Sequence, residues 1–311
     1  MDKWKPWAAF LFLGGLAWGT SFLWIKIALE EIGPFTLVAY RVGFGCLTVW
    51  ILMWLLRLRL APSRGQLRIM ILLGLIYTAI PFVLISWAEK HIDSGIAGIL
   101  NGSMPLFTML IAHWTLPDDR ITIPKAIGLI TGLVGLALLV IRDIRPEGLA
   151  GSLWGQLAVV GAAICYAVGV VLIRSRLKGM HSVPVAAVAL SVALVVALAA
   201  ALIVEHPFAI PRHPRTWLAC SWMGILSTGL SYLAGVYLIH AWGATRSALV
   251  TYLFPVTAVA LGIIFFGERP SWQELAGGVL VIGGIALVNA RPASPQLIAR
   301  EPKTASDRGE K

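Results

Sequence analysis

The chain has 311 residues, of which 58% are hydrophobic and 13% are charged, whereas soluble domains carry about 25% charged residues. This composition excludes an ordinary soluble globular protein, and apolar runs too long for core strands indicate a polytopic membrane protein. The formal net charge of +10 would favour a nucleic-acid partner in a soluble protein. In a membrane protein the same excess of Lys and Arg can mark the loops that face the cytoplasm, so we expect no nucleic-acid partner.

Long apolar runs, separated by charged or proline-containing breaks, predict ten transmembrane helices, because about 20 apolar residues span a bilayer. The predicted spans are residues 7–27, 35–56, 68–87, 95–116, 124–141, 152–174, 184–204, 216–238, 246–266 and 273–290. The first run exceeds the core of a cleavable signal peptide, so we expect it to remain as a span. We therefore predict an all-α, polytopic integral protein of the cytoplasmic (inner) cell membrane.

The basic residues of the loops predict the orientation of these spans, because Lys and Arg resist translocation across the membrane. One set of alternate segments contains 17 Lys and Arg residues, and the other set contains 7. The richer set includes both ends of the chain. We therefore expect a cytoplasmic amino terminus over residues 1–6 and a cytoplasmic carboxyl terminus. Residues 291–311 are rich in Pro, Ser and charge, which predicts a disordered tail.

The two halves of the sequence resemble each other at an offset near 150 residues. Residues 101–105 (Asn-Gly-Ser-Met-Pro) align with residues 251–255 (Thr-Tyr-Leu-Phe-Pro), so each half has a proline near the middle of its fourth predicted helix. We interpret residues 7–145 and 150–290 as two five-helix repeats. Because five is an odd number, the two copies must cross the membrane in opposite directions. Such an inverted repeat favours alternating access, in which a site between the halves opens first to one side and then to the other.

Several motifs occur in order along the chain: residues 18–22 (Trp-Gly-Thr-Ser-Phe) with Lys26, Arg41 in the second span, Pro105 and Pro255, residues 267–269 (Gly-Glu-Arg), and glycine-rich fifth and tenth spans. With these motifs the sequence resembles the drug/metabolite transporter superfamily, specifically its EamA-type, ten-helix members, over residues 7–290. Characterised members mostly export amino acids, other metabolites or cationic drugs, so the resemblance implies efflux. The first repeat departs from the family pattern, because it has residues 117–120 (Pro-Asp-Asp-Arg) where Gly-Glu-Arg is usual.

Arg41 is a charged residue placed within an apolar run. An arginine inside such a helix costs about 2.5 to 3.5 kcal/mol on insertion scales, so it needs water or a partner. One interpretation makes Arg41 an anion-binding or gating residue of a transport pathway. The other interpretation is that its side chain reaches the outer surface, where it extends to water or pairs with Glu30 or Glu31.

Polar and aromatic side chains at mid-membrane depth are candidates for the walls of a substrate pathway, since Tyr and Trp combine a π face with a polar group. Besides Arg41 and Glu89, the candidate pathway residues are Trp18, Thr20, Tyr77, Asn101, Tyr166, Ser231, Tyr232 and Tyr252. Glu89, at the predicted outer end of the third span, could accept a proton or a cationic substrate, or could simply belong to a solvated helix end. The aromatic residues could equally pack the core or form interface belts.

Three prolines within predicted spans are candidates for bending or gating positions. Pro81, Pro105 and Pro255 each remove a backbone hydrogen bond, which a helix tolerates beside a cavity or a neighbouring helix. A static kink would leave the same pattern. The glycines of the fifth and tenth spans, such as Gly128 and Gly284, favour close packing between helices and could also support a homodimer.

The sequence lacks the motifs of common enzyme classes. It contains no HExxH, GxSxG, P-loop or GxGxxG sequence, and its His and Cys residues show no metal-ligand spacing. We therefore expect no enzyme activity, no cofactor and no metal. Transport would run on a gradient of the substrate itself or of protons.

The leading hypothesis from the sequence is a membrane transporter that exports amino acids or similar small organic metabolites through a central aromatic-lined cavity. Its expected partners are a small-molecule substrate and the lipid bilayer. An alternative is a membrane-embedded enzyme acting on lipid-linked substrates, which would need clustered carboxylates or His near one surface. A receptor or scaffold that transports nothing would need neither an inverted repeat nor polar groups at mid-membrane depth.

Overall fold

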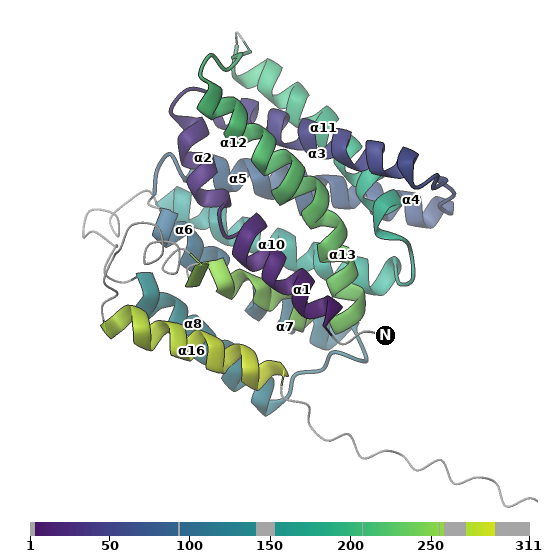
Figure 1. The fold of residues 1–311 in the computed structure, drawn as a ribbon. Helices are drawn as coiled ribbons and strands as arrows, with labels where there is room; N and C mark the ends of the chain where they lie inside the picture. Colours follow the sequence, from purple (N-terminus) through teal and green to yellow (C-terminus); the bar gives the residue numbers. More distant parts are fainter. Residues whose placement is uncertain are drawn as a thin grey trace, which may run out of the picture.

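The computed structural model describes residues 4–92, 94–140, 153–206, 208–254, 256–257 and 272–289, with the side chains of residues 94–96, 99, 139–140 and 274 excepted. Pro255, the Gly-Glu-Arg sequence at 267–269 and the predicted tail at 291–311 lie outside the described residues. Throughout the described part, all regular secondary structure is helical, as the composition predicts (Figure 1).

Six helices of the described part are long and apolar enough to cross a membrane. They are Lys5–Leu29, Pro34–Leu55, Arg64–Ala88, Leu153–Arg176, Ser182–Val204 and Pro214–Trp242. Each overlaps one predicted span, and two shorter apolar helices, Ile123–Leu138 and Leu275–Asn289, overlap the predicted fifth and tenth spans. Large apolar side chains such as Trp54 and Trp114 are largely exposed, as a surface in contact with lipid tails requires.

Three of these spans contain a short π-helical segment, in which hydrogen bonds join residue i to residue i+5 and the turn widens. The first span consists of α1 (Lys5–Leu11), η1 (Phe12–Ala17) and α2 (Ser21–Leu29). The other two are α4 (Arg64–Leu73), η2 (Gly74–Ala79) and α5 (Ile80–Ala88), and α12 (Pro214–Gly224), η3 (Ile225–Leu230) and α13 (Ser231–Trp242). Because η2 and η3 begin 151 residues apart, they occupy equivalent positions in the two halves of the sequence.

The prediction of one continuous helix over residues 95–116 is wrong. The segment is divided into α6 (Ser94–Asn101) and α7 (Met104–Thr115), with a turn between them. Pro105 lies in the first turn of α7, where the N–H that proline lacks would have no partner in the same helix. Pro81 lies within the third span, directly after η2, where the span changes from π-helical to α-helical. The equivalent segment of the second half begins with α14 (Ala244–Ala248) and continues as the 3-10 helix η4 (Leu249–Tyr252).

Equivalent helices of the two halves pack against each other. α8 (Ile123–Val140) lies along α16 (Trp272–Asn289), and α3 (Pro34–Leu55) lies along α11 (Ser182–Val204) (Figure 1). Glycines allow the first pair to approach closely. A Cβ atom at Gly128 would lie 2.8 Å from the carbonyl oxygen of Gly284, and one at Gly284 would lie 2.6 Å from that of Gly128. The predicted packing role of these two glycines is confirmed.

The centre of the molecule is formed by both halves. α10 (Leu153–Arg176), the first helix of the second half, packs against α5, α7 and η2 of the first half. In the same way, α1 and α2 of the first half pack against α13 and α12 of the second. The first span of each half therefore contacts the third span of the other, and the π-helical segments η2 and η3 face the interior between them.

Candidate functional site

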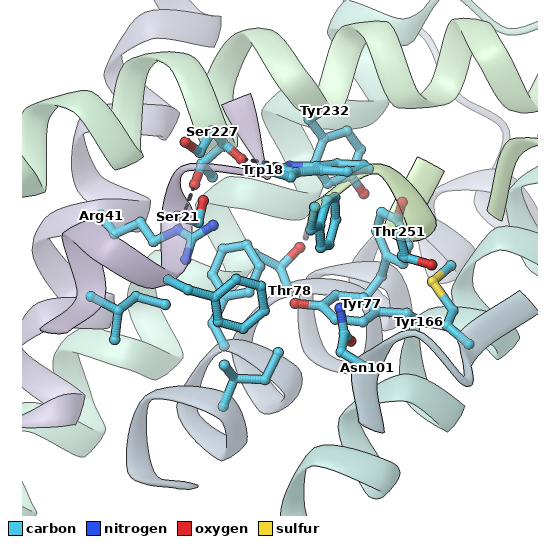
Figure 2. A pocket seen from close by; sticks show the side chains of 17 residues that line it. Trp18, Ser21, Arg41, Tyr77, Thr78, Asn101, Tyr166, Ser227, Tyr232 and Thr251 are labelled. Carbon is cyan, nitrogen blue, oxygen red and sulfur yellow. Dashed lines mark hydrogen bonds between the residues drawn. The ribbon is translucent and has the colours of Figure 1, made fainter. Parts of the chain in front are cut away.

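A cavity of about 90 Å³ lies between the two halves, which is enough space for several water molecules. Figure 2 shows side chains reaching it from helices of both halves. Six of the predicted pathway residues line it: Trp18, Arg41, Tyr77, Asn101, Tyr166 and Tyr232. Eleven further lining residues were not predicted: Ser21, Phe22, Ile25, Thr78, Phe82, Ile85, Met104, Ser227, Thr228, Thr251 and Phe254.

Arg41 is held at the cavity by one contact from each half. Its side chain is buried, with 5% of the residue exposed. The Nε–H donates a hydrogen bond of 3.0 Å to the hydroxyl of Thr228 in η3, and the guanidinium carbon lies 4.0 Å from the ring centroid of Phe82 in α5. Cation–π contact and a hydroxyl acceptor both favour the charged guanidinium in a place with little water.

The predicted alternative for Arg41, a pair with Glu30 or Glu31, is wrong. Glu30 instead forms an ion pair of 2.9 Å with Arg215, and Glu31 accepts hydrogen bonds at the N-terminus of α12. Among the described residues, none of the ion pairs includes Arg41. A buried charge without an ion pair is expensive unless water or a ligand compensates it, so Arg41 makes this cavity a candidate functional site.

Trp18 and Ser227 join the first span to the η3 segment by two reciprocal hydrogen bonds. The indole N–H of Trp18 donates to the carbonyl oxygen of Ser227 at 2.8 Å, and the hydroxyl of Ser227 donates to the carbonyl oxygen of Ala17 at 2.6 Å. The helix is interrupted after Ala17, and this carbonyl accepts side-chain hydroxyls from Ser227 and, at 3.2 Å, from Ser21. We call Ala17, Trp18 and Ser227 the cavity clasp, because they fasten one half to the other beside Arg41.

Three tyrosines from three helices form an aromatic wall. The ring of Tyr77 lies 5.7 Å from that of Tyr166 and 5.6 Å from that of Tyr232, edge to face in both pairs. Space for Tyr77 is provided by Gly169 of α10, where a Cβ atom would lie 2.8 Å from the Cβ of the tyrosine. Edge-to-face aromatic pairs stabilise such a cluster while leaving π faces and hydroxyls available to a guest molecule.

Several polar atoms of the lining have no hydrogen-bond partner within the part of the chain that the structure describes. They are Thr78 Oγ1, Asn101 Oδ1 and Tyr232 OH, each in a residue that is more than nine-tenths buried. Buried polar groups are almost always hydrogen-bonded, so such groups beside a cavity indicate places where water or a ligand completes the bonding.

Thr20 and Ser231, two predicted pathway residues, are not part of the cavity lining. The hydroxyl of Thr20 donates to the carbonyl oxygen of Leu16 at 2.8 Å and accepts the indole N–H of Trp222 at 3.2 Å. The hydroxyl of Ser231 donates to the carbonyl oxygen of Leu226 at 2.7 Å. In this structure both hydroxyls therefore satisfy helix carbonyls.

Tyr252 and Glu89 also lie outside the lining. Tyr252 is fully buried, packs against Gly132, and donates its hydroxyl to the carbonyl oxygen of Leu129 at 2.9 Å, so it joins η4 to α8. Glu89 is buried at the end of α5 and interacts electrostatically with Arg41.

At one end of the molecule, a carboxylate from each half caps a helix of the other half. Glu31 accepts hydrogen bonds from two backbone N–H groups and from the hydroxyl of Thr216, at the N-terminus of α12. Glu205 accepts two backbone N–H groups at the N-terminus of α3, at 2.9 and 3.1 Å. The hydrogen bond from Thr216 is the main cause that lowers the pKa of Glu31. Anions are favoured at helix N-termini, so these contacts hold the halves together at this end.

At the opposite end, two aspartates of the first half bind the second half. Asp118 pairs with Arg174 of α10 at 2.5 Å, and this hydrogen bond lowers the pKa of Asp118. Asp119 accepts the backbone N–H of Thr245 at 2.8 Å, at the start of α14, and pairs with Lys125 at 2.6 Å. These aspartates belong to the Pro-Asp-Asp-Arg turn that departs from the family pattern.

Nothing in the described ranges resembles a metal site, because no three His, Cys, Asp or Glu side chains converge there. The cysteines Cys46, Cys165 and Cys220 are free thiols. The aromatic and hydroxyl lining with one buried cation can bind an organic molecule, and it contains no pair of carboxylates among its described residues.

Comparison with known proteins agrees with this architecture. The model of the EamA-like transporter family matches residues 5–141 and again residues 153–290. The uncharacterized transporter YoaV of Bacillus subtilis is 23% identical over 87% of this chain and 92% of its own length. A probable terminal-alkyne amino-acid exporter of Streptantibioticus cattleyicolor is 25% identical over 90% of this chain and 92% of its own length.

A solved crystal structure has the same fold, with a TM-score of 0.74 and 21% sequence identity over 92% of this chain and 95% of that one. The two successive family matches confirm that the chain contains two copies of one unit. The chain therefore belongs to the EamA-like transporter family of the drug/metabolite transporter superfamily, and it is a multi-pass membrane transporter.

Proposed function

We propose that this transporter exports amino acids or similar small organic metabolites from the cytoplasm by alternating access around the cavity. The observation that carries the proposal is the cavity between the repeats, whose lining combines one buried arginine with aromatic and hydroxyl side chains. Such a lining can hold an amphipathic molecule by ionic, stacking and hydrogen-bond contacts. The similarity to a protein named as a probable amino-acid exporter supports the choice of amino acids.

In this proposal the repeats, residues 7–145 and 150–290, enter the cytoplasmic (inner) membrane in opposite directions, and both termini are cytoplasmic. The end with Glu31 and Glu205 then faces outward, and the end with Asp118 and Asp119 faces the cytoplasm. Each end has its own polar contacts between the repeats. Opening the cavity to one side would break one set of contacts while the other set stays closed.

Reconstituted transport tests the function directly. Purified protein in liposomes should release amino acids loaded from a broad panel faster than liposomes without protein. The panel should include aromatic and aliphatic amino acids, because the lining is largely aromatic. An absence of protein-dependent flux for every member of the panel would reject amino-acid export.

Cysteine accessibility tests the orientation. In a background without the native cysteines, Ser63→Cys should react with a membrane-impermeant thiol reagent only from the cytoplasmic side, and Arg212→Cys only from the outer side. Reaction of both sites from the same side would contradict the inverted arrangement of the repeats.

A further inference from the structure

We propose that the cavity selects its substrate by a carboxylate group, which binds the two Nη groups of Arg41, and that an ammonium group is not required. The inference rests on the proposed function and names the chemical group by which an exported molecule is recognised. It predicts that organic carboxylates bind whether or not they are amino acids, and that the matching amines do not.

The charge of the lining is the first reason. Among the described residues that line the cavity, Arg41 carries the one formal charge, and the lining contains no carboxylate. A bound carboxylate would neutralise this buried cation, whereas a bound amine would place a second positive charge in the same poorly solvated space. The carboxylate of Glu89 lies outside the lining, and it interacts electrostatically with Arg41 without occupying the cavity.

The geometry of the guanidinium is the second reason. Arginine has five N–H donors in a planar fork. The Nε–H of Arg41 is taken by Thr228, and one face of the plane is covered by Phe82. Neither Nη group has a hydrogen-bond partner among the described protein atoms. The two Nη groups are therefore left to bind the two oxygens of a carboxylate end-on, which is the planar pairing that arginine favours.

The rest of the lining explains why the part of the substrate outside the carboxylate can vary. Figure 2 shows Asn101 and Thr251 across the cavity from Arg41, and Tyr166 interacts electrostatically with Arg41. These residues and Tyr77 offer uncharged hydrogen-bonding groups and π faces. Such groups can accept an ammonium group, an amide or an apolar side chain with small differences in free energy. The cavity thus requires a carboxylate at Arg41 and tolerates several kinds of chemical group in the rest of its lining.

Thr228 has a positioning role in this recognition. Its hydroxyl comes from η3 of the second repeat and fixes the guanidinium plane of an arginine from the first repeat. The neighbouring Ser227 belongs to the cavity clasp. A substrate carboxylate that binds Arg41 therefore lies at a point where the two repeats are in contact.

The test uses matched ligands with one ring and different end groups. Phenylalanine, N-acetylphenylalanine and hydrocinnamate keep the carboxylate, whereas phenylalaninamide and phenethylamine lack it. We expect the three carboxylates to raise the Tm of the purified protein in detergent. We also expect the two amines to need at least about 10-fold higher concentrations, because they lose the charge-assisted hydrogen bonds.

Variants assign the effect to named residues. Arg41→Gln should abolish the preference for carboxylates, and Arg41→Lys should keep part of it, because lysine retains the charge but not the planar fork. Thr228→Val should weaken carboxylate binding about 3- to 10-fold, the loss expected for one hydrogen bond, without changing binding of phenethylamine, and Thr228→Ser should restore it. Lys26→Gln removes an exposed cation outside the lining and should leave the preference unchanged.

Equal stabilisation by amines and carboxylates, or no stabilisation by any of the three carboxylates, would overturn the inference. If Arg41→Gln does not fold, the ligand series on the wild-type protein and on Thr228→Val still tests the preference for carboxylates. Carboxylate-dependent stabilisation without flux of any amino acid would reject the proposed export and leave the inference standing. Amino-acid flux that amines and carboxylates inhibit equally would support the proposed export and reject the preference for carboxylates.

Discussion

The two repeats share one fold but contribute different chemistry to the cavity. At the offset of about 150 residues, Arg41 of α3 corresponds to Ser191 of α11. Arg41 lines the cavity, whereas Ser191 accepts the indole N–H of Trp50 at 2.9 Å and packs between α3 and α11. The first repeat therefore supplies the charge, and the second supplies Thr228, which holds it.

The π-helical segments show the same division. η2 contributes Tyr77 and Thr78 to the cavity lining, and η3 contributes Ser227 and Thr228. The tyrosine of η2 builds the aromatic wall, while the hydroxyls of η3 bind the backbone of the first span and the guanidinium. Repeat symmetry thus governs which helices pack together, and departures from symmetry create the site.

Moving the arginine between the repeats is the strongest test of this difference. Arg41→Ser should reduce amino-acid flux about 10- to 100-fold, because the charge-assisted bonds to a carboxylate are lost. The double variant Arg41→Ser with Ser191→Arg should not recover flux, since position 191 lies between α3 and α11. Ser191→Ala should transport at the wild-type level, with initial rates in proteoliposomes as the measurement. Recovery in the double variant would show that the repeats are functionally equivalent.

Removing the cavity clasp should have the next largest effect. Trp18→Phe keeps an aromatic ring but leaves the carbonyl oxygen of Ser227 without its indole donor, which costs about 1–3 kcal/mol when a buried acceptor loses its partner. We expect lower flux and a lower Tm. Trp222→Phe is the matched control, because it removes an indole hydrogen bond to Thr20 outside the cavity lining. A larger loss of flux in Trp222→Phe than in Trp18→Phe would indicate that the functional site lies near Thr20 and not at the cavity clasp.

The aromatic wall can be disturbed without touching any of its own residues. Gly169→Ala would place a Cβ atom 2.8 Å from the Cβ of Tyr77, so the tyrosine must move at a cost of about 1–3 kcal/mol. The expected result is a lower Tm and reduced flux. At Gly161 of the same helix, a Cβ atom would meet Leu84 at an ordinary 3.8 Å, so Gly161→Ala should retain both properties. Equal behaviour of the two variants would contradict the proposed role of the wall.

Much of the architecture follows from the sequence, because lipid demands long apolar helices and the duplication repeats their order. Arg41 and the aromatic residues could also be chosen from the sequence, since such groups at mid-membrane depth need a special environment. Ser227 and Thr228 could not, because small hydroxyl residues in an apolar helix are equally suited to bonding their own carbonyls. Thr251 could have been chosen as a cavity residue from the sequence, because it aligns with Asn101 at the repeat offset.

Irregular backbone limits what periodicity can predict. The π-helical segments shift the faces of the first span and of the third span of each half relative to a regular α-helix, so helical spacing does not show which side chains reach the cavity. The division between α6 and α7 was hidden because Pro105 fits both a kink within one helix and the first turn of a new one. Tyr252 is a related case, because a mid-span tyrosine suits both a cavity and the packing contact with Leu129 that the structure shows.

The smallest expected effect concerns the reciprocal caps, in which Glu31 of the first repeat binds α12 and Glu205 of the second binds α3. The pKa of Glu31 is lowered from its ordinary value of 4.5, first by the hydrogen bond from Thr216. A carboxylate whose pKa falls on folding stabilises the folded state above its unfolded pKa, and this contribution is lost as the pH falls through the folded value. Wild-type protein should therefore lose more Tm on acidification below about pH 4.5 than Glu31→Gln.

Glu30→Gln is the control for this acid effect, because Glu30 and Arg215 are both more than half exposed, and exposed ion pairs contribute about 0–1 kcal/mol. Its Tm should follow the wild-type dependence on pH. If Glu31→Gln also follows the wild type, the cap at α12 does not hold the repeats together. The cap of Glu205 on α3 would then be the one of the two caps that joins the repeats at this end. The two caps would then be unequal, and the difference between the repeats would extend from the cavity to the surface.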